Sequence, residues 1–161
     1  MTGTRPLSQS APNGYSVTNV FSIQAGRQVT RPVDRHWWHS VEARLQELIR
    51  LEDGWDGYAG QPVNFGNAVF ALRVLESTCK SETPPPEIVP GTSGDLQLEW
   101  HLPKGEIELH VHAPNDVSAW RLISGTALME EQASLTTDFS LVAKWIRELT
   151  EASLAPRAAA A

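Results

Sequence analysis

Histidines and glutamates alternate with apolar residues between positions 97 and 112, and they are the side chains of this chain best suited to chemistry. Imidazole and carboxylate groups are the ligands that Zn²⁺ and other first-row metals accept. His110 and His112 share one face of a strand, and in the expected hairpin His101 and Glu108 share the same side of the sheet. A metal held by these four residues would support a small metal-assisted hydrolase or nuclease.

The same residues also fit an ordinary solvated surface, because opposite Glu and His side chains commonly pair on the outside of an antiparallel sheet. Residues two apart along a strand are separated by about 6.5 to 7 Å, a spacing that does not select for chelation. The sequence therefore favours a polar sheet face, and it predicts neither a bound metal nor another cofactor.

The segment Glu52–Gly57 holds three carboxylates, but its spacing does not match the 12-residue calcium loop of an EF-hand. Asp-Gly pairs are typical of tight turns, so we expect a turn that Trp55 and Tyr58 anchor to the core. The chain contains no P-loop, GxGxxG or HExxH motif and no Ser-His-Asp spacing. Its single cysteine, Cys79, closes an apolar helical stripe and is expected to be buried and structural.

Apolar residues at helical spacing predict two helices before the first strand. The first should run from about Arg35 to Leu51, and a Gly-rich segment then prevents its continuation. Asn64 is expected to cap the second helix, which ends near Lys80. The predicted buried stripe of this second helix consists of Phe65, Val69, Leu72, Leu75 and Cys79.

The period of the apolar residues changes from helical to alternating after a run of three prolines. Such alternation, interrupted by turn residues, is typical of a meander. A two-residue loop at Lys104-Gly105 would close the central hairpin and place Trp100 opposite Leu109. The expected strands cover about residues 87–90, 95–102, 106–112 and 117–124.

The predicted fold class is α+β, with two helices, an antiparallel meander of about four strands and a C-terminal helix. The helices are expected to pack on one face of the sheet, which leaves the His/Glu face polar. The last strand should point Trp120 and Leu122 inward. Thr136 or Thr137 is expected to cap the final helix.

The length of 161 residues fits one domain, and the composition divides the chain into three parts. We expect a mobile basic arm over residues 1–33, a single α+β domain over 34–154 and a frayed Ala-rich tail over 155–161. Residues 1–36 carry four arginines and one aspartate, a net charge of +3, whereas nine basic and 18 acidic residues give the remainder −9. An acidic body disfavours nucleic acid and suits a basic protein partner. The absence of a long apolar run predicts a cytoplasmic protein without a membrane span.

The chain contains six tryptophans, which the predicted elements divide into two groups. Trp38, Trp100, Trp120 and Trp145 fall on predicted inward faces and are expected in the core. Aromatic residues left outside a core are common at interface hot spots. The candidate partner-binding residues are Phe21, Arg27, Arg31, Trp37, Trp55 and Tyr58.

Two motifs give the chain a resemblance to other sequences. Leu51–Tyr58 with Pro62 lies between two predicted helices, and a Pro-x-Ile-x-Pro pattern and Gly94–Trp100 follow downstream. Over roughly residues 40–112, the chain resembles a group of short bacterial proteins of largely unassigned function. It departs from them at Ser93–Asp95, where that group tends to carry Asp-Gly-Gly. The resemblance implies a bacterial, mobile-element or phage origin, and it implies no catalytic residues.

Three functions therefore stay open. The leading hypothesis is a non-enzymatic protein-binding module of a bacterium or phage, such as an inhibitor, an antitoxin-like neutraliser or an accessory subunit of a defence or counter-defence system. The alternatives are the metal-assisted hydrolase or nuclease, and a nucleic-acid-binding regulator that uses the N-terminal arm. The sequence does not indicate the oligomeric state.

Overall fold

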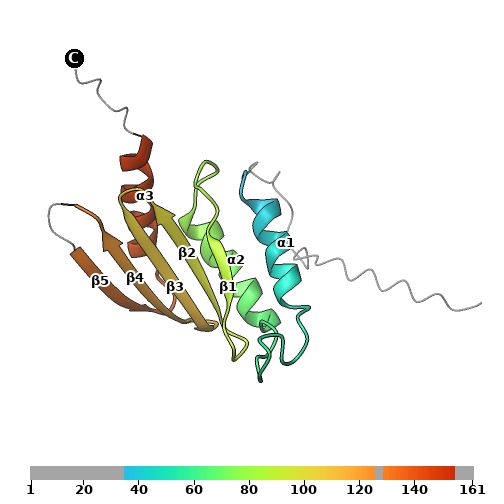
Figure 1. The fold of residues 1–161 in the computed structure, drawn as a ribbon. Coiled ribbons are helices and arrows are strands. Elements are labelled where there is room, and N and C mark those ends of the chain that lie inside the picture. The colour runs from blue at the N-terminus through green and yellow to red at the C-terminus, as the bar shows by residue number, and fades with distance from the viewer. Residues whose placement is uncertain (1–34, 126–128, 155–161) are drawn as a thin grey trace, which may run out of the picture.

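A computed structural model describes residues 35–125 and 129–154, so the predicted arm and tail lie outside the described residues. Two helices precede a five-stranded antiparallel sheet, and a third helix follows it (Figure 1). No described helix is long and apolar enough to span a membrane. The elements are α1 (Trp38–Leu48), α2 (Phe65–Thr78), β1 (Glu87–Pro90), β2 (Leu96–Leu102), β3 (Gly105–Ala113), β4 (Asp116–Ile123), β5 (Met129–Leu135) and α3 (Ser140–Leu154).

The five strands form a meander in the order β1-β2-β3-β4-β5, and every neighbouring pair is antiparallel. Helices α2 and α3 pack against β2 and β3, while α1 packs against α2 and the edge strand β1 (Figure 1). The predicted α+β class and the predicted C-terminal helix are confirmed. The strand count is five rather than about four, because β5 was not anticipated.

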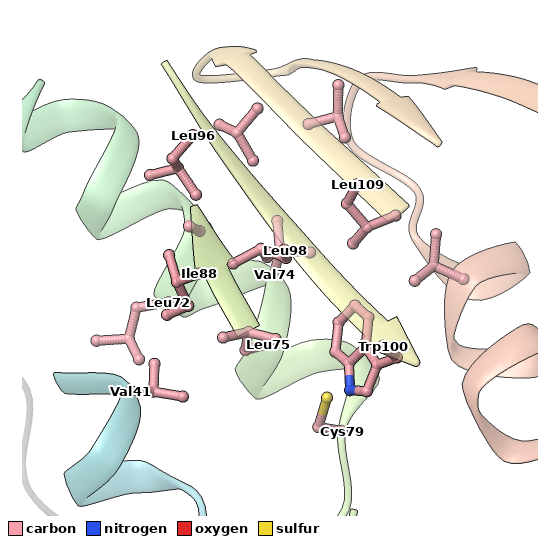
Figure 2. Close-up of a cluster of buried hydrophobic side chains, with 14 of the residues drawn as sticks. Val41, Leu72, Val74, Leu75, Cys79, Ile88, Leu96, Leu98, Trp100 and Leu109 are labelled. Carbon is pink, nitrogen blue, oxygen red and sulfur yellow. The ribbon is translucent and has the colours of Figure 1, made fainter. Parts of the chain in front are cut away.

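The core lies between the sheet and the helices, where alternate strand residues meet the apolar side of α2 (Figure 2). Leu98, Trp100 and Leu109 are each at most 2% exposed. Burial of such side chains contributes about 1.5–3 kcal/mol each, so this cluster supplies much of the driving force for folding. Cys79 is buried in the same cluster, as predicted, and burial raises the pKa of its thiol to about 11.

Helix α2 begins as predicted, and Leu72, Leu75 and Cys79 of its predicted stripe are buried. The Asn64 carboxamide oxygen accepts a hydrogen bond from the Gly66 N–H at 2.8 Å, which confirms the cap. Phe65 is 61% exposed, so the prediction that it begins the buried stripe was wrong. The helix also turns its small residues Ala68 and Ala71 to the core, which lets it approach the sheet closely.

The other two helices differ from prediction at their ends. Helix α1 is shorter than the predicted Arg35–Leu51 span at both ends. At the start of α3, the Asp138 carboxylate accepts a hydrogen bond from the Ser140 N–H at 2.9 Å, in place of a cap by Thr136 or Thr137. This hydrogen bond lowers the pKa of Asp138, since it stabilises the charged carboxylate.

The central hairpin turns one residue earlier than predicted, at Pro103-Lys104. Leu102 pairs with Gly105, and Trp100 pairs with Ile107 rather than with Leu109. The register therefore differs by two residues along β3, and an even shift leaves every side chain on its predicted face. The pattern of apolar residues sets the face, but both registers satisfy that pattern equally well.

Strand β4 turns to the core the face that was predicted to point outward. Ala119 and Arg121 point inward and are 3% and 5% exposed, whereas Trp120 lies half-buried on the other side of the sheet. The prediction that Trp120 and Leu122 face the core was wrong. Arg121 occupies the inward position because its guanidinium pairs with Glu131 on β5 and Glu148 on α3, so its charge is not left alone.

The close pairing of β3 and β4 leads to a prediction for Gly105. A Cβ atom at Gly105 would lie 2.1 Å from the backbone oxygen of Leu122, so Gly105→Ala must push the two strands apart. We expect Gly105→Ala to lower the free energy of unfolding by about 2–3 kcal/mol in urea titrations. Gly57→Ala is the matched control: an added Cβ meets no atom there, and only its φ of +83° opposes the change, at a cost of about 1 kcal/mol. A loss at Gly105 no larger than at Gly57 would contradict the prediction.

Candidate protein-binding interface

The side of the sheet that faces away from the helices is not covered by any described element, and we call it the outer face (Figure 1). Alternation along the strands places polar side chains there, while their apolar neighbours point to the core. No Lys or Arg occurs among its positions in the described strands. The outer face consists of Glu87, Val89, Gln97, Glu99, His101, Glu106, Glu108, His110, His112, Ser118, Trp120, Leu122, Glu130, Gln132 and Ser134.

Three glutamates stand side by side across the outer face. Glu87 pairs with Glu99, and Glu99 pairs with Glu108, so three carboxylates lie in one row across β1, β2 and β3. Like charges directly opposite one another destabilise a sheet. The apolar residues between these glutamates fix the face, and the turn at Pro103-Lys104 sets the register that brings Glu99 opposite Glu108. Folding thus proceeds against this repulsion, and a cationic partner would relieve it.

The middle residue of the row is the place to measure that repulsion. We expect Glu99→Gln to raise the free energy of unfolding by about 0.3–0.5 kcal/mol at pH 7 and low salt, because it removes the carboxylate that faces both Glu87 and Glu108. The gain should shrink at 1 M salt, where surface charges are screened. Thermal unfolding at both salt concentrations checks this. Glu76→Gln, an exposed change on α2, should give no gain; a destabilised Glu99→Gln would show that the row carries no repulsion.

The histidines of the outer face are each engaged with a neighbour. His110 Nε2 is hydrogen-bonded to the Asp95 carboxylate, and His112 Nε2 lies 2.9 Å from the Ser118 hydroxyl. The two imidazole rings are 4.0 Å apart between centroids. Burial opposes ionisation of Asp95, but hydrogen bonds from His110 and from the Ser93 N–H outweigh it and lower the pKa of this carboxyl.

The four candidate metal ligands, His101, Glu108, His110 and His112, do not converge on one point. His101 Nε2 lies 3.1 Å from Glu99 Oε2, and Glu108 Oε1 accepts a hydrogen bond from Gln97 at 3.1 Å. In residues 35–125 and 129–154, no group of three or more His, Cys, Asp or Glu side chains could hold a metal ion. The four candidates are therefore spread over separate polar pairs on the outer face.

Trp120 is an outer-face residue that sequence reasoning had placed in the core. Its indole N–H donates to Glu130 Oε1 at 2.8 Å, and Gln132 Nε2 donates to the same oxygen at 3.0 Å. These hydrogen bonds lower the pKa of Glu130 and orient the indole on the surface. A surface tryptophan beside glutamates is the kind of anchor that protein interfaces use.

The predicted partner-binding residues fall into three groups. Phe21, Arg27 and Arg31 lie outside the described residues. Trp37 is 1% exposed and donates its indole N–H to the Lys80 carbonyl at 2.8 Å, so its side chain is not accessible to a partner. The assignment of Trp37 to a partner-binding surface was wrong, and Trp38, which was expected in the core, is half-buried and packs against the core cluster.

Trp55 and Tyr58 lie in the turn between α1 and α2. The Asp56 carboxylate accepts hydrogen bonds from the N–H groups of Tyr58 and Gly60, both at 2.9 Å, which lower its pKa and hold the turn closed. Trp55 donates its indole N–H to the Gln61 carbonyl at 3.0 Å. Tyr58 is 90% exposed, so the expectation that its ring anchors the turn to the core was wrong.

The chain matches no protein-family model, no curated protein and no solved structure. Its function is inferred from the chemistry of the outer face.

Proposed function

We propose that the protein is a non-enzymatic binding module, of a bacterium or its phage, whose outer face binds a basic surface of another protein. The observation that carries the proposal is the uncovered row of Glu87, Glu99 and Glu108, with no Lys or Arg beside it on the described strands. An inhibitor, an antitoxin-like neutraliser and an accessory subunit all act through a surface of this kind.

Charge complementarity supports a basic partner. The outer face carries five glutamates, and Arg or Lys side chains from a partner would neutralise a repulsion that the free protein retains. Opposite charges across an interface also raise the rate of association and exclude acidic competitors. A phosphate backbone is disfavoured for the same reason, because it would meet carboxylates over the whole face.

The outer face is also rigid enough to act as a preformed surface. Its strands are paired along their lengths, and the opposite side of each strand is fixed in the core. A surface built on paired strands loses little conformational entropy on binding, which favours affinity. Trp120 adds an oriented aromatic group beside the charges.

The experiment compares proteins captured from a host lysate by three immobilised forms of the full chain. These are the wild type, the double variant Glu99→Lys/Glu108→Lys, and the control variant Glu42→Lys/Glu76→Lys, which changes the same charge on the helices. We expect a protein that the wild type and the control retain and that the outer-face variant loses by at least about 10-fold.

Salt provides the second criterion. Capture through the outer face should weaken steadily between 50 and 500 mM salt, because the interaction is between opposite charges. Circular dichroism of the double variant must match the wild type, so that the loss reflects the surface. Equal capture by the wild type and the outer-face variant, across several growth conditions, would overturn the proposal.

A further inference from the structure

A shallow hollow of about 370 Å³ lies on the outer face over β3, β4 and β5. The strand register explains its shape. One row places Glu108 beside Trp120 and Gln132, and the next row places His110 beside two serines, Ser118 and Ser134. The small serines form a low floor between larger side chains, so the surface dips at that point.

Several of the hydrogen-bond donors around this hollow are already used. The Trp120 indole N–H and a Gln132 amide N–H both point to Glu130 Oε1, and Gln97 Nε2 donates to Glu108 Oε1. The indole has no second N–H to donate. The Glu108 carboxylate and the Gln132 amide each keep a side-chain oxygen that can accept a hydrogen bond. Glu108 Oε2 and Gln132 Oε1 thus remain as acceptors at the rim.

His110 also lines the hollow. Its Nε2 is hydrogen-bonded to Asp95, whose lowered pKa keeps that carboxyl ionised at neutral pH. An ionised carboxylate only accepts, so His110 Nε2 donates the proton of that hydrogen bond. Carboxylate and amide acceptors therefore line one hollow that also contains an aromatic ring.

We propose that this hollow binds the guanidinium group of an arginine side chain from the partner, an inference that rests on the proposed function. Guanidinium is planar, carries five N–H donors and no acceptor, and stacks on aromatic rings. It matches an acceptor-rich hollow with an indole wall and a nearby carboxylate. A lysine ammonium offers three donors and no planar face, so arginine is the better ligand.

The probe is N-acetyl-arginine-methylamide, titrated into the full chain labelled with ¹⁵N and followed by the Trp120 indole N–H signal. The Trp120→Phe variant identifies that signal by its disappearance. We expect a saturable shift in the millimolar range, at least about threefold weaker for the corresponding lysine derivative. Glu108→Gln should weaken binding of the arginine derivative by about fivefold or more, whereas Glu76→Gln should leave it unchanged.

The inference is overturned if the two derivatives shift the signal equally, if the shift does not saturate, or if Glu108→Gln has no effect. Its failure is distinguishable from failure of the proposed function. A partner lost from the Glu99→Lys/Glu108→Lys variant, with no arginine binding, would refute only the hollow. Arginine binding with no charge-dependent partner would refute only the proposed function.

Discussion

Arg121→Ala is expected to lower the free energy of unfolding by about 2–3 kcal/mol at pH 7, because it removes the ion pairs of a buried guanidinium with Glu131 and Glu148. The Arg121 guanidinium donates from Nε and Nη2 to Glu131 at 3.0 and 3.1 Å, and from Nη1 to Glu148 at 2.6 Å. It also lies 5.0 Å from the centre of the Trp145 ring. The side chain is 7% exposed, so it links β4, β5 and α3 inside the fold.

Urea unfolding of two further variants separates the charge from the packing. Arg121→Met loses the same ion pairs but keeps most of the apolar length of the side chain, so it should lose less stability than Arg121→Ala by the packing that this length contributes. Arg147→Ala removes an exposed cation from α3 and should change stability by less than about 0.5 kcal/mol. An Arg121→Ala variant as stable as Arg147→Ala would show that the ion pairs contribute nothing.

The effect of Arg121→Ala should depend on pH. The hydrogen bonds from Arg121 lower the pKa of Glu131 below its unfolded value. A lowered pKa in the folded state gives stability that is present above the unfolded pKa of about 4.3 and is lost as the pH falls through the folded pKa. The difference between wild type and Arg121→Ala should therefore narrow from pH 7 to pH 3.

Strand β4 shows why sequence pattern alone misplaced this arginine. Its odd positions hold Val117, Ala119 and Arg121, and its even positions hold Trp120 and Leu122, so both faces look equally apolar. Alternation cannot choose between them, and a shift of one residue exchanges the faces completely. The choice depends on Glu131 and Glu148, which come from elements that the pattern of β4 does not include.

Strand β5 was missed for a related reason. Its inward positions include Glu131 as well as Ala133 and Leu135, so its apolar alternation is interrupted. That glutamate is tolerated only because Arg121 reaches it from β4. Sequence reasoning thus anticipated the helices and the regular strands β2 and β3, whose patterns are complete within each segment. It failed for β4 and β5, where the ion pair between Arg121 and Glu131 takes the place of an apolar contact between the two strands.

The sequence predicted which side chains of β2 and β3 share the outer face, but not how these side chains pair across the two strands. The alternation of β2 and β3 places Glu99, His101, Glu108, His110 and His112 together, as expected. The hairpin expected from a loop at Lys104-Gly105, with Trp100 opposite Leu109, would also place Glu99 opposite His110, but the observed turn lies one residue earlier. A two-residue change of register converts the expected Glu-His pair into the Glu99-Glu108 pair. Repulsion across the outer face could therefore not be seen without the observed turn.

Trp100→Ala should produce the largest loss of stability that a single core substitution causes here, about 3–5 kcal/mol. The indole is 2% exposed, lies in a central strand, and donates its N–H to the Pro84 carbonyl at 3.0 Å. Removing it leaves a large cavity between β2 and α2 and an unpaired carbonyl. Trp100→Phe keeps most of the aromatic volume, so its loss should be only about 1–2 kcal/mol.

Cys79 supplies the measurement, because it is the single thiol of the chain and belongs to the same buried cluster (Figure 2). A buried thiol reacts with an aromatic disulfide reagent only when the protein opens, so the labelling rate at pH 8 reports the open population. A loss of about 4 kcal/mol corresponds to labelling about 1,000-fold faster. Val41→Ala, a smaller core change on α1, should accelerate labelling far less. Labelling of Trp100→Ala no faster than of Val41→Ala would mean that the core closes around the missing indole, and the predicted cavity would not exist.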